Sequence, residues 1–447
     1  MLCLTVIEDA CMASLRLSRW LPRIRGLMSH VTSAEVNVCC GGCRLSLSHH
    51  GIMSSSPVYC SKRTFIQSRG IAAGIAQFNG FVEIPLEDGR AAVCNTTWLR
   101  ENCRCSQCYT SETSQRKIQF HRMSDPKAFT IDTITRHSSH EDHLTVRWAD
   151  GHQSVYTTKW IKQMVIDSRH SRPTEKFLWN RMTMAEIIAE KKCHATYEAL
   201  LYDKQTPKLL LNSLVRYGIG FIDDCPQSLE ATVKVAEKVS YLQTTFYGKS
   251  WEFSNVNMDF KDTAYTNEEI VPHNDGTYFY DPPGLQVFHC LEHHGSGGET
   301  MLIDGFNCAE ILRSQSPDLF RVLLRTRLCH DFADPQLKNR NQETVLRADP
   351  VTDEMEWIRY NPYDRSAYST VTQGELPEMY AALASLAKVL EDPGNECRVK
   401  LRPGTVLFID NWRVLHGRCS FTGTRRLCGC YISRDAWVRE ARTQGLL

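Results

Sequence analysis

The sequence predicts a mainly β protein with flanking helices, in which a jelly roll (a double-stranded β-helix) follows a smaller β-rich domain. The main observation is a series of apolar, strand-like runs separated by Gly and Pro turns. These runs are Leu285–Leu291, Glu299–Ile303, Met355–Tyr360, Arg398–Leu401, Thr405–Ile409 and Leu427–Ile432. One long stretch of helical periodicity, Leu376–Glu391, interrupts them. Many strands with few helices are typical of a double-sheet jelly roll.

Length and charge narrow the class of protein. The chain has 447 residues, enough for two domains after an N-terminal extension. Its 52 basic and 51 acidic residues are balanced, which argues against a protein that coats nucleic acid or an anionic membrane. No stretch approaches the roughly 20 apolar residues that a membrane helix needs. The 19 Cys are odd in number and scattered, which favours a reducing compartment. We therefore expect a globular enzyme whose partner is a small molecule.

The N-terminal segment, residues 1–73, differs in composition from the rest of the chain. Between Met12 and Gly70 it is rich in Arg and Ser and contains a single acid, Glu35. Such a composition is typical of a mitochondrial transit peptide. The alternatives are a disordered tail or a start codon further along, at Met12 or Met28.

Two folded domains are predicted after this segment, over residues 74–172 and 173–447. The first contains short strand-like runs with polar turns between them, namely Phe81–Ile84, Ile118–Phe120, Leu144–Trp148 and Ser154–Thr157. In the second, Leu209–Tyr217 and Ser228–Leu242 have the apolar spacing of helices, and Gly218 is placed to cap the former.

A cluster of cysteines in the first domain suggests a metal site. Cys103, Cys105 and Cys108 lie within six residues, and thiols so closely spaced can surround one soft ion. A structural zinc site needs four ligands. Possible fourth ligands are His152, His143, His140, His121 and Cys94. We favour His152 because it follows the turn at Asp150 and Gly151 and lies between two predicted strands. The alternative is a loop of three reduced cysteines.

The run His273-Asn274-Asp275 suggests a second metal site. Residues i and i+2 of an extended strand face the same way, so His273 and Asp275 can be directed to one point. A second His would complete an iron(II) site of two His and one carboxylate, with open positions for a co-substrate and oxygen. His416, after the run Thr405–Ile409, is the favoured second His, and its rivals are His289, His293 and His294. The alternative is that these are hydrogen-bonded structural histidines.

The pair Arg425-Arg426 follows His416 and suggests a carboxylate anchor. The planar guanidinium matches a carboxylate with two parallel hydrogen bonds. In an extended stretch the two arginines face opposite sides, so only one can point into a site. Thr300 could add a hydroxyl hydrogen bond. The alternatives are solvated surface charges and an ordinary strand threonine.

Aromatic residues form a fourth group of interest. They are Tyr247, Trp251, Tyr265, Tyr278, Tyr280 and Tyr431. Ring faces attract a quaternary ammonium ion through cation–π contacts of about 2 kcal/mol or more when desolvated. The alternative is core packing, the usual role of such side chains.

Eight segments together resemble the γ-butyrobetaine hydroxylase family, which are iron(II)- and 2-oxoglutarate-dependent dioxygenases of carnitine biosynthesis. These segments are LRENCRCSQCY (Leu99–Tyr109), TFYGKSW (Thr245–Trp251), DTAYT (Asp262–Thr266), HND (His273–Asp275), PPGLQVFHC (Pro282–Cys290), GGETMLIDGF (Gly297–Phe306), IRYNPYDR (Ile358–Arg365) and FIDNWRVLHGR (Phe408–Arg418). The resemblance extends over roughly residues 74–447.

The resemblance implies a role for each group of residues. Zinc would be bound by Cys103, Cys105, Cys108 and His152. Iron would be bound by His273, Asp275 and His416. The 2-oxoglutarate would be bound by Arg425, to which we add Thr300. The trimethylammonium cage would be Tyr247, Trp251, Tyr265 and Tyr431. This chain has Tyr363 where the butyrobetaine enzyme carries an asparagine for its substrate carboxylate, and we expect Asp364 and Arg365 to bind the charges of an amino-acid end.

The reaction implied is hydroxylation of Nε-trimethyllysine at carbon 3, the first step of carnitine biosynthesis. It would use iron(II), 2-oxoglutarate and molecular oxygen, with ascorbate as reductant. We expect a homodimer in the mitochondrial matrix, with no nucleic-acid or membrane partner. The alternatives are the same chemistry on γ-butyrobetaine, the last step of that pathway, and a catalytically silent metal-binding interaction protein with the same fold.

Overall fold

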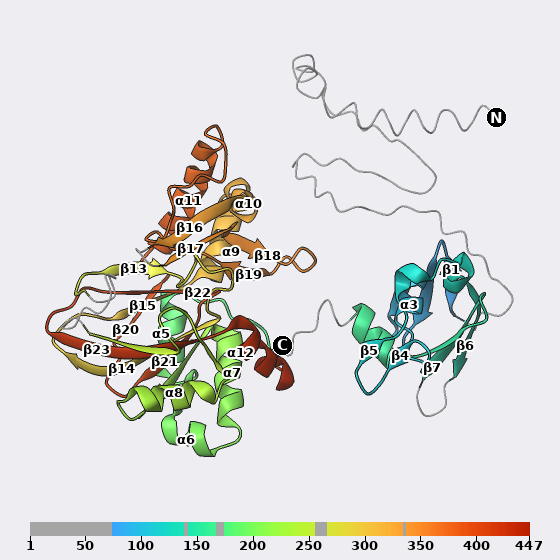
Figure 1. Cartoon of the computed structure of the whole chain (residues 1–447), viewed down its shortest axis with the longest axis horizontal. Helices are drawn as coiled ribbons and strands as arrows, with labels where there is room; N and C mark the ends of the chain where they lie inside the picture. Colours follow the sequence, from blue (N-terminus) through green and yellow to red (C-terminus); the bar gives the residue numbers. More distant parts are fainter. Residues whose placement is uncertain (1–73, 138–141, 167–173, 255–265, 334–336) are drawn as a thin grey trace, which may run out of the picture. The chain divides into compact units, whose positions relative to one another are not determined.

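The computed structural model describes residues 74–137, 142–166, 174–254, 266–333 and 337–447. The expected targeting segment and the predicted domain boundary at 172/173 lie outside these residues. Described strands fall into two groups that do not pair with each other, one between residues 76 and 157 and the other between residues 194 and 432 (Figure 1). In this part of the chain, no helix has the length and apolar character needed to cross a membrane.

The first group forms two three-stranded antiparallel sheets. One contains β1 (Ala76–Phe78), β2 (Phe81–Pro85) and β3 (Ala91–Asn95), and the other contains β6 (Ile131–His137), β7 (His143–Trp148) and β8 (Gln153–Thr157). Alternate residues of these strands share one core, which includes Val82, Ile84, Leu144, Val146 and Trp148. Short elements complete the domain, namely α3 (Thr96–Glu101), β4 (Tyr109–Thr110), β5 (Gln115–Arg116) and α4 (Thr158–Ile161).

Three of the four strands predicted in this domain are confirmed, and one is wrong. Ile118–Phe120 is not a strand, because β5 ends at Arg116 and Phe120 begins a short 3-10 turn. The Phe120 side chain is 46% exposed. Its apolar character therefore gave a false strand signal.

Most strands of the second group form the predicted jelly roll, and the predicted strand Met355–Tyr360 lies outside it, in a separate hairpin. Its larger sheet has the order β11-β23-β14-β21-β10-β9, with β12 also paired to β23, and its smaller sheet has the order β13-β22-β15-β20. The larger sheet contains β9 (His194–Thr196), β10 (Ile219–Asp223), β11 (Leu242–Gln243), β12 (Ser250–Ser254), β14 (Leu285–His294), β21 (Val406–Asp410) and β23 (Thr424–Ile432). The smaller sheet contains β13 (Ile270–His273), β15 (Thr300–Asp304), β20 (Glu396–Val399) and β22 (Val414–Arg418).

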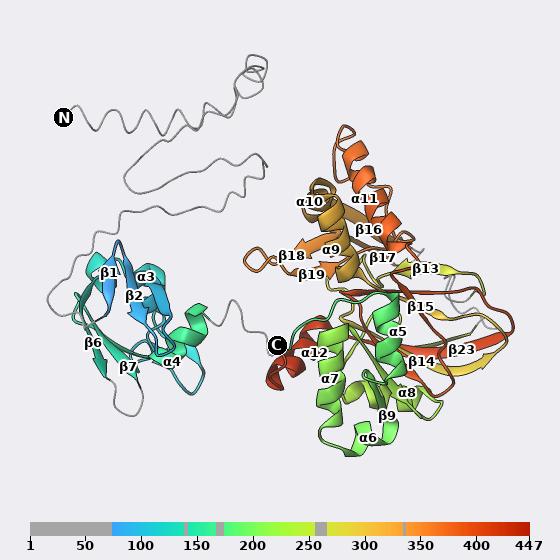
Figure 2. The same ribbon diagram turned by 180° about the vertical axis from the view of Figure 1, so that it is seen from behind.

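Both faces of the larger sheet are buried, which explains its continuous apolar runs. On β21, Val406 and Phe408 pack against the helices, whereas Leu407 and Ile409 pack toward the smaller sheet. The outer face is covered by α6 (Tyr197–Tyr202), α7 (Thr206–Tyr217), α8 (Leu229–Glu237) and α12 (Arg434–Thr443) (Figures 1 and 2). The inner face is left to the smaller sheet and to a cavity.

The remaining helices form a separate layer. Helices α9 (Gly305–Gln315), α10 (Pro317–Arg325) and α11 (Leu376–Leu390) pack with the hairpin β18 (Leu346–Ala348) and β19 (Met355–Ile358). A second hairpin joins β16 (Arg327–Ala333) to β17 (Lys338–Thr344), and α5 (Arg181–Ala189) contacts β20. The predicted helices Leu209–Tyr217 and Leu376–Glu391 are confirmed, and Gly218 caps α7 with φ +75°. The helix predicted over Ser228–Leu242 ends earlier, at Glu237, because Leu242 joins β11.

A buried ion pair joins the end of β15 to the start of β22, the two central strands of the smaller sheet. Arg413 donates to Asp304 from Nη2 at 2.7 Å and from Nε at 3.1 Å, and both side chains are almost fully buried. Arg413 also donates to the carbonyls of Phe177 and Arg216. Asp304 in turn accepts from the backbone N–H of Trp179. The segment that leads into His416 is therefore held by charge-assisted hydrogen bonds.

Candidate active site and metal centres

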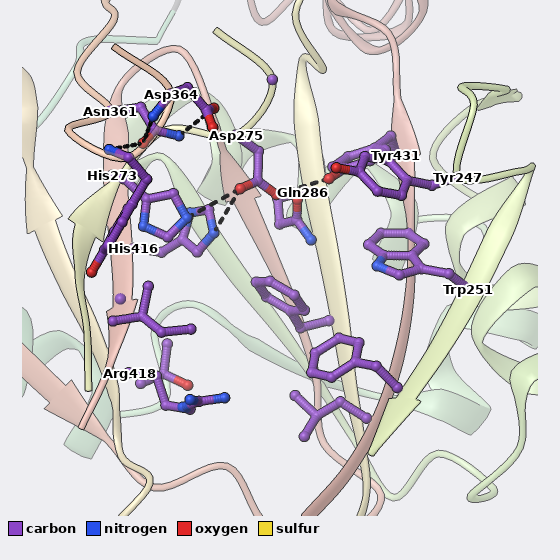
Figure 3. Close-up of a pocket in the computed structure, with 18 of the residues that line it drawn as sticks. Tyr247, Trp251, His273, Asp275, Gln286, Asn361, Asp364, His416, Arg418 and Tyr431 are labelled. Carbon is purple, nitrogen blue, oxygen red and sulfur yellow. Dashed lines mark hydrogen bonds and ion pairs between the residues drawn. The ribbon is translucent and has the colours of Figure 1, made fainter. Parts of the chain in front are cut away.

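Two histidines and a carboxylate meet on the smaller sheet. His273 ends β13 and His416 lies on β22, and the antiparallel register places them opposite each other. Oδ1 of Asp275 lies 3.2 Å from Nε2 of His273 and 3.6 Å from Nε2 of His416 (Figure 3). The three possible ligand atoms lie within 4.8 Å of one another. Below, these three residues are called the triad.

The turn after β21 fixes the backbone of the triad carboxylate. Oδ1 of Asn411 accepts from the N–H of Asp275 at 2.8 Å, and Nδ2 of Asn411 donates to the Asp275 carbonyl at 3.0 Å. Asn274 points the opposite way and is buried, and its amide donates to the Asn411 carbonyl and accepts from the N–H of Tyr360. The alternation of side chains along the strand thus places Asp275 beside His273, and Asn411 holds it there.

The protonation states of the triad suit metal binding. Nδ1 of His273 lies 2.8 Å from the Val271 carbonyl, so it carries a proton and Nε2 is the atom that would bind a metal ion. Burial opposes a charge on His273, but the neighbouring Asp275 raises the pKa of this imidazole overall. Burial lowers the pKa of His416 to about 4, so this imidazole is neutral. Burial opposes ionisation of Asp275, but His416, His273 and the Tyr431 hydroxyl together lower its pKa to about 2. The triad therefore offers the neutral imidazole of His416 and an ionised carboxylate, and a metal ion would take the place of a proton on Nε2 of His273.

The spacing of the triad also suits a metal ion. Two ligand atoms at right angles, each about 2.1 Å from an octahedral ion, lie about 3 Å apart. The separations of 3.2 and 3.6 Å are close to this value. Two imidazoles and one carboxylate beside open space are the donor set of non-haem iron(II) oxygenases.

A cavity of about 310 Å³ opens beside the triad and contains two buried arginines. Arg425 points into the cavity together with Arg418 and Thr300. Burial and the neighbouring Arg418 lower the pKa of Arg425 to about 10, so it remains charged at neutral pH. Arg426 turns outward instead and pairs with Glu252 at 2.8 Å and with Glu292 at 2.5 Å. A buried pair of guanidinium groups suits a dianionic ligand such as a dicarboxylate.

Aromatic rings line another part of the cavity. Trp251 lies opposite Gly429, whose missing side chain leaves room for the indole, and it stacks on Tyr431 with a centroid separation of 4.7 Å. Tyr431 donates a 2.9 Å hydrogen bond to Oδ2 of Asp275. The hydroxyls of Tyr247 and Tyr278 lie 3.0 Å apart. Burial raises the pKa of Tyr431 well above its usual range, so its hydroxyl stays protonated.

The structure places one further expected aromatic residue outside this group and does not describe another. Tyr280 is 87% exposed and does not line the cavity. Tyr265 lies outside the described residues. Tyr247, Trp251 and Tyr431, which do line the cavity, are called the aromatic cage below.

A third part of the cavity lies next to His273. Asp364, Asn361 and Tyr363 line it, and Asn361 donates to Asp364 at 2.7 Å (Figure 3). The expectation for Arg365 needs correction, because this side chain is exposed and its guanidinium lies over the ring of Tyr380, outside the cavity. The physical reason is the turn at Asn361, whose Oδ1 accepts from the N–H groups of Tyr363 and Asp364.

Comparison with known proteins identifies the family. A family model described as taurine catabolism dioxygenase TauD, TfdA family matches residues 186–431, which include the whole triad. A second model, γ-butyrobetaine hydroxylase-like, N-terminal, matches residues 75–163. The chain belongs to the TauD, TfdA dioxygenase family. It is a 2-oxoglutarate-dependent dioxygenase, and the family implies dependence on iron(II).

Relatives of this dioxygenase cover most of its length. The mitochondrial trimethyllysine dioxygenase of Bos taurus is 38% identical over 360 residues, which are 78% of this chain and 82% of the relative. The trimethyllysine dioxygenase of Meyerozyma guilliermondii is 35% identical, over 80% of this chain and 92% of the relative. The γ-butyrobetaine dioxygenase of Pongo abelii is 25% identical, over 79% of this chain and 92% of the relative.

The rival histidines of the dioxygenase domain lie away from the triad. His289 is buried on the helix side of β14, where its Nδ1 lies 2.7 Å from the Thr232 hydroxyl, and burial lowers its pKa to about 4. His293 lies 3.0 Å from Nζ of Lys400, and His294 is exposed. Neither belongs to a cluster of possible ligands among the described residues.

Sequence reasoning missed two polar residues in the cavity of this dioxygenase. Arg418 lies two residues after His416 and donates to the carbonyls of Thr266 and Glu268. Gln286 lies on β14 and is fully buried. A glutamine inside the apolar run Leu285–Leu291 was the one signal that could have pointed to it, because a buried polar side chain needs a partner.

The N-terminal domain of the dioxygenase brings its cysteine cluster together with His152. Nε2 of His152 lies 3.4 Å from Sγ of Cys103, 3.6 Å from Cys105 and 3.5 Å from Cys108. Tetrahedral zinc, with bonds of about 2.3 Å to sulfur and about 2.1 Å to nitrogen, places these atoms about 3.5 Å apart. The other described candidates, His143, His121 and Cys94, are not in this cluster. His140 lies outside the described residues.

Proposed function

We propose that this dioxygenase hydroxylates Nε-trimethyllysine at carbon 3. The relatives support this substrate. The two trimethyllysine dioxygenases, from Bos taurus and Meyerozyma guilliermondii, are 38% and 35% identical in sequence to this chain, whereas the γ-butyrobetaine dioxygenase is 25% identical. The observation that carries the proposal is the position of Asp364. This carboxylate lines the cavity near His273, whereas Tyr247 and Trp251 of the aromatic cage lie beyond Asp275 (Figure 3).

Asp364 supports trimethyllysine over γ-butyrobetaine on electrostatic grounds. Both compounds carry a trimethylammonium group that the aromatic cage would bind through its ring faces. At the other end, trimethyllysine carries an α-ammonium beside its carboxylate, whereas γ-butyrobetaine carries a carboxylate alone. A half-buried aspartate at the cavity wall attracts the ammonium and repels an isolated carboxylate. Asn361, which donates to Asp364, would help to orient this contact.

The triad would hold the iron(II) ion of this reaction. Iron(II) bound by His273, Asp275 and His416 would supply the oxidising chemistry, in which 2-oxoglutarate and oxygen give succinate, carbon dioxide and the hydroxylated product. Asn411 and Tyr431 position the carboxylate through its backbone and its Oδ2. The cavity walls position the substrate carbon, which is the protein's main contribution in a cofactor enzyme.

The buried guanidinium of Arg425 would bind the distal carboxylate of 2-oxoglutarate, with the Thr300 hydroxyl as a second donor. Arg425→Met is expected to raise the KM for 2-oxoglutarate about 10- to 100-fold, since a hydrogen bond to a charged group contributes roughly 1.5–3 kcal/mol. The KM for trimethyllysine should change far less.

Arg426→Met is the matched control for this substitution. Arg426 pairs with Glu252 and Glu292 outside the cavity, so its loss should change the 2-oxoglutarate KM less than about threefold. Steady-state kinetics with varied 2-oxoglutarate measures both. A larger rise of the 2-oxoglutarate KM in Arg426→Met than in Arg425→Met would contradict the assignment, because it would place the anchor on the other face of β23.

The substrate assignment is tested by assaying trimethyllysine and γ-butyrobetaine side by side with Asp364→Asn. The wild-type enzyme should prefer trimethyllysine. In the variant, the KM for trimethyllysine should rise by roughly tenfold or more. The preference for trimethyllysine over γ-butyrobetaine should become smaller, because the charge that repels the γ-butyrobetaine carboxylate is gone. Asp318→Asn, an exposed change outside the cavity, is the control. Better turnover of γ-butyrobetaine by the wild-type enzyme would refute the proposal.

The finer cofactor and cellular assignments are proposed together with this function. Zinc would be held by Cys103, Cys105, Cys108 and His152, and ascorbate would keep the iron reduced. We propose a matrix enzyme, on the acid-poor N-terminal segment and the mitochondrial bovine relative. We propose a homodimer because this is the commonest soluble oligomer. Light scattering that gives the mass of a single 51.1 kDa chain would refute the dimer.

A further inference from the structure

Gln286 is the buried polar side chain of the cavity whose role the reaction described above does not explain. It lies on β14 between Tyr431 of β23 and Ile409 of β21, is fully buried and lines the cavity. Neither its amide oxygen nor its amide nitrogen has a hydrogen-bond partner among the described residues.

The neighbours of Gln286 in the sheet cannot satisfy its acceptor. Ile409 is apolar, and Tyr431 already donates its hydroxyl hydrogen to Asp275. Native proteins leave few buried amides unpaired, because losing water without gaining a partner is costly. The partner of the Gln286 oxygen is therefore expected to come from a molecule that fills the cavity.

The position of Gln286 limits which part of that molecule it meets. Figure 3 shows it between Asp275 and Trp251, on the side of the triad where the aromatic cage lies. Arg425 and Thr300, the residues that suit the co-substrate, belong to other strand positions, and Gln286 pairs with Tyr431 rather than with the Arg425 end of β23. Gln286 therefore lies at the end of the cavity where the aromatic cage would bind the cationic group of the substrate.

The chemistry of a quaternary ammonium matches an amide oxygen at this place. The ion has no N–H group, and its positive charge is spread over the hydrogens of its methyl groups. Such polarised C–H groups donate weakly to carbonyl oxygen. A side-chain amide can exchange its oxygen and nitrogen by a half turn, so the oxygen can face the cage while the NH2 group faces the Asp275 and Tyr431 oxygens.

We propose that Gln286 is a specificity-determining residue of this dioxygenase, whose amide oxygen completes the aromatic cage as a dipolar acceptor for the quaternary ammonium of the substrate. The proposal rests on the proposed function, because it requires a cationic substrate. According to this proposal, the enzyme prefers a cation over a neutral group of the same shape because of the Gln286 amide oxygen as well as the ring faces. Ring faces and the amide dipole then share the recognition of charge.

The test compares a cation with its neutral isostere by binding. Trimethyllysine and its analogue with a tert-butyl group in place of trimethylammonium are titrated calorimetrically into the enzyme loaded with iron(II) and 2-oxoglutarate under anaerobic conditions. Gln286→Met keeps the length of the side chain and removes the amide. It should weaken trimethyllysine binding about three- to tenfold and change binding of the analogue and of 2-oxoglutarate less than about twofold. Gln286→Leu gives the same comparison if the methionine variant does not fold.

Gln286→Glu separates the oxygen from the NH2 group, because it keeps an acceptor oxygen. It should retain the preference for trimethyllysine. Equal weakening of both ligands in Gln286→Met, or loss of the preference in Gln286→Glu to the extent seen in Gln286→Met, would overturn the proposal. A wild-type enzyme that binds the neutral analogue as tightly as trimethyllysine would refute the proposed cationic substrate itself, which is a different failure.

Discussion

Asp275→Ala is expected to abolish hydroxylation while leaving the fold intact. The carboxylate is the only anionic member of the triad, and its Oδ1 faces Nε2 of both histidines. Without it, two neutral imidazoles remain, which is too few ligands to hold iron(II) in a defined geometry. Turnover should fall by roughly a thousandfold or more, the order of loss when an essential catalytic group is removed.

The fold should survive this substitution because the backbone, not the carboxylate, carries the local structure. Asn411 binds both the N–H and the carbonyl of Asp275, and alanine keeps both contacts. Removing a buried charge also removes its desolvation cost. The thermal midpoint should therefore shift by only a few degrees, which circular dichroism measures.

Asp281→Ala is the matched control for the carboxylate. Asp281 lies six residues further along the chain, is exposed and does not line the cavity. Its loss should leave turnover within about twofold of wild type. Iron content after anaerobic loading distinguishes the two variants, and full activity and full iron binding in Asp275→Ala would remove this residue from the triad.

Local strand geometry made two of the three triad residues predictable from sequence. The period of two along an extended chain places His273 and Asp275 on one side, and the structure directs Asn274 to the other. The same rule separated Arg425 from Arg426. Such statements need only the backbone conformation of a few neighbouring residues.

The partner histidine could not be derived in this way. His416 lies opposite His273 because β13 pairs with β22 in one register, and that pairing joins segments far apart in the chain. His289 was a reasonable alternative for the second histidine ligand, because β14 is buried on both faces. Periodicity alone does not show which face of such a strand points toward the cavity. The packing of α8 against the sheet determines the face, because the Thr232 hydroxyl of α8 forms a hydrogen bond with His289 on the side away from the cavity.

Loop residues were the least predictable part of the site. Asp364 and Arg365 are neighbours, yet the turn at Asn361 directs the first into the cavity and leaves the second exposed. No period applies in such a turn, because its side-chain directions depend on individual hydrogen bonds. Gln286 was missed for the opposite reason, since its surroundings look like those of an ordinary buried strand.

His152→Asn is expected to remove zinc and to unfold the N-terminal domain. Its Nε2 is within 3.6 Å of all three thiols, so it is placed to close a tetrahedral site. Structural zinc contributes folding free energy directly, about 10–16 kcal/mol in small zinc-binding peptides. The segment between α3 and β6 contains only the two-residue strands β4 and β5 and two 3-10 turns, so it has few other stabilising contacts. Cys105→Ser should act in the same way.

The electrostatics of the cluster explain why a metal ion is needed there. Burial raises the pKa of Cys108 to about 12 despite the 3.4 Å contact with Nη1 of Arg100, so without a cation this thiol stays protonated at neutral pH. Burial and Arg100 lower the pKa of His152, which keeps the imidazole neutral and able to bind zinc. Zinc binding must therefore release thiol protons, and its affinity should fall as the pH falls.

His143→Asn is the control that separates loss of a ligand from loss of a histidine. His143 lies on β7 of the same domain and stacks on His137, away from the cysteine cluster. Elemental analysis after dialysis should find one zinc per chain in wild type and in His143→Asn, and none in His152→Asn. Calorimetry should show loss of the unfolding transition of the N-terminal domain only in His152→Asn. Zinc at wild-type content in His152→Asn, or no zinc in the wild-type protein, would contradict the assignment.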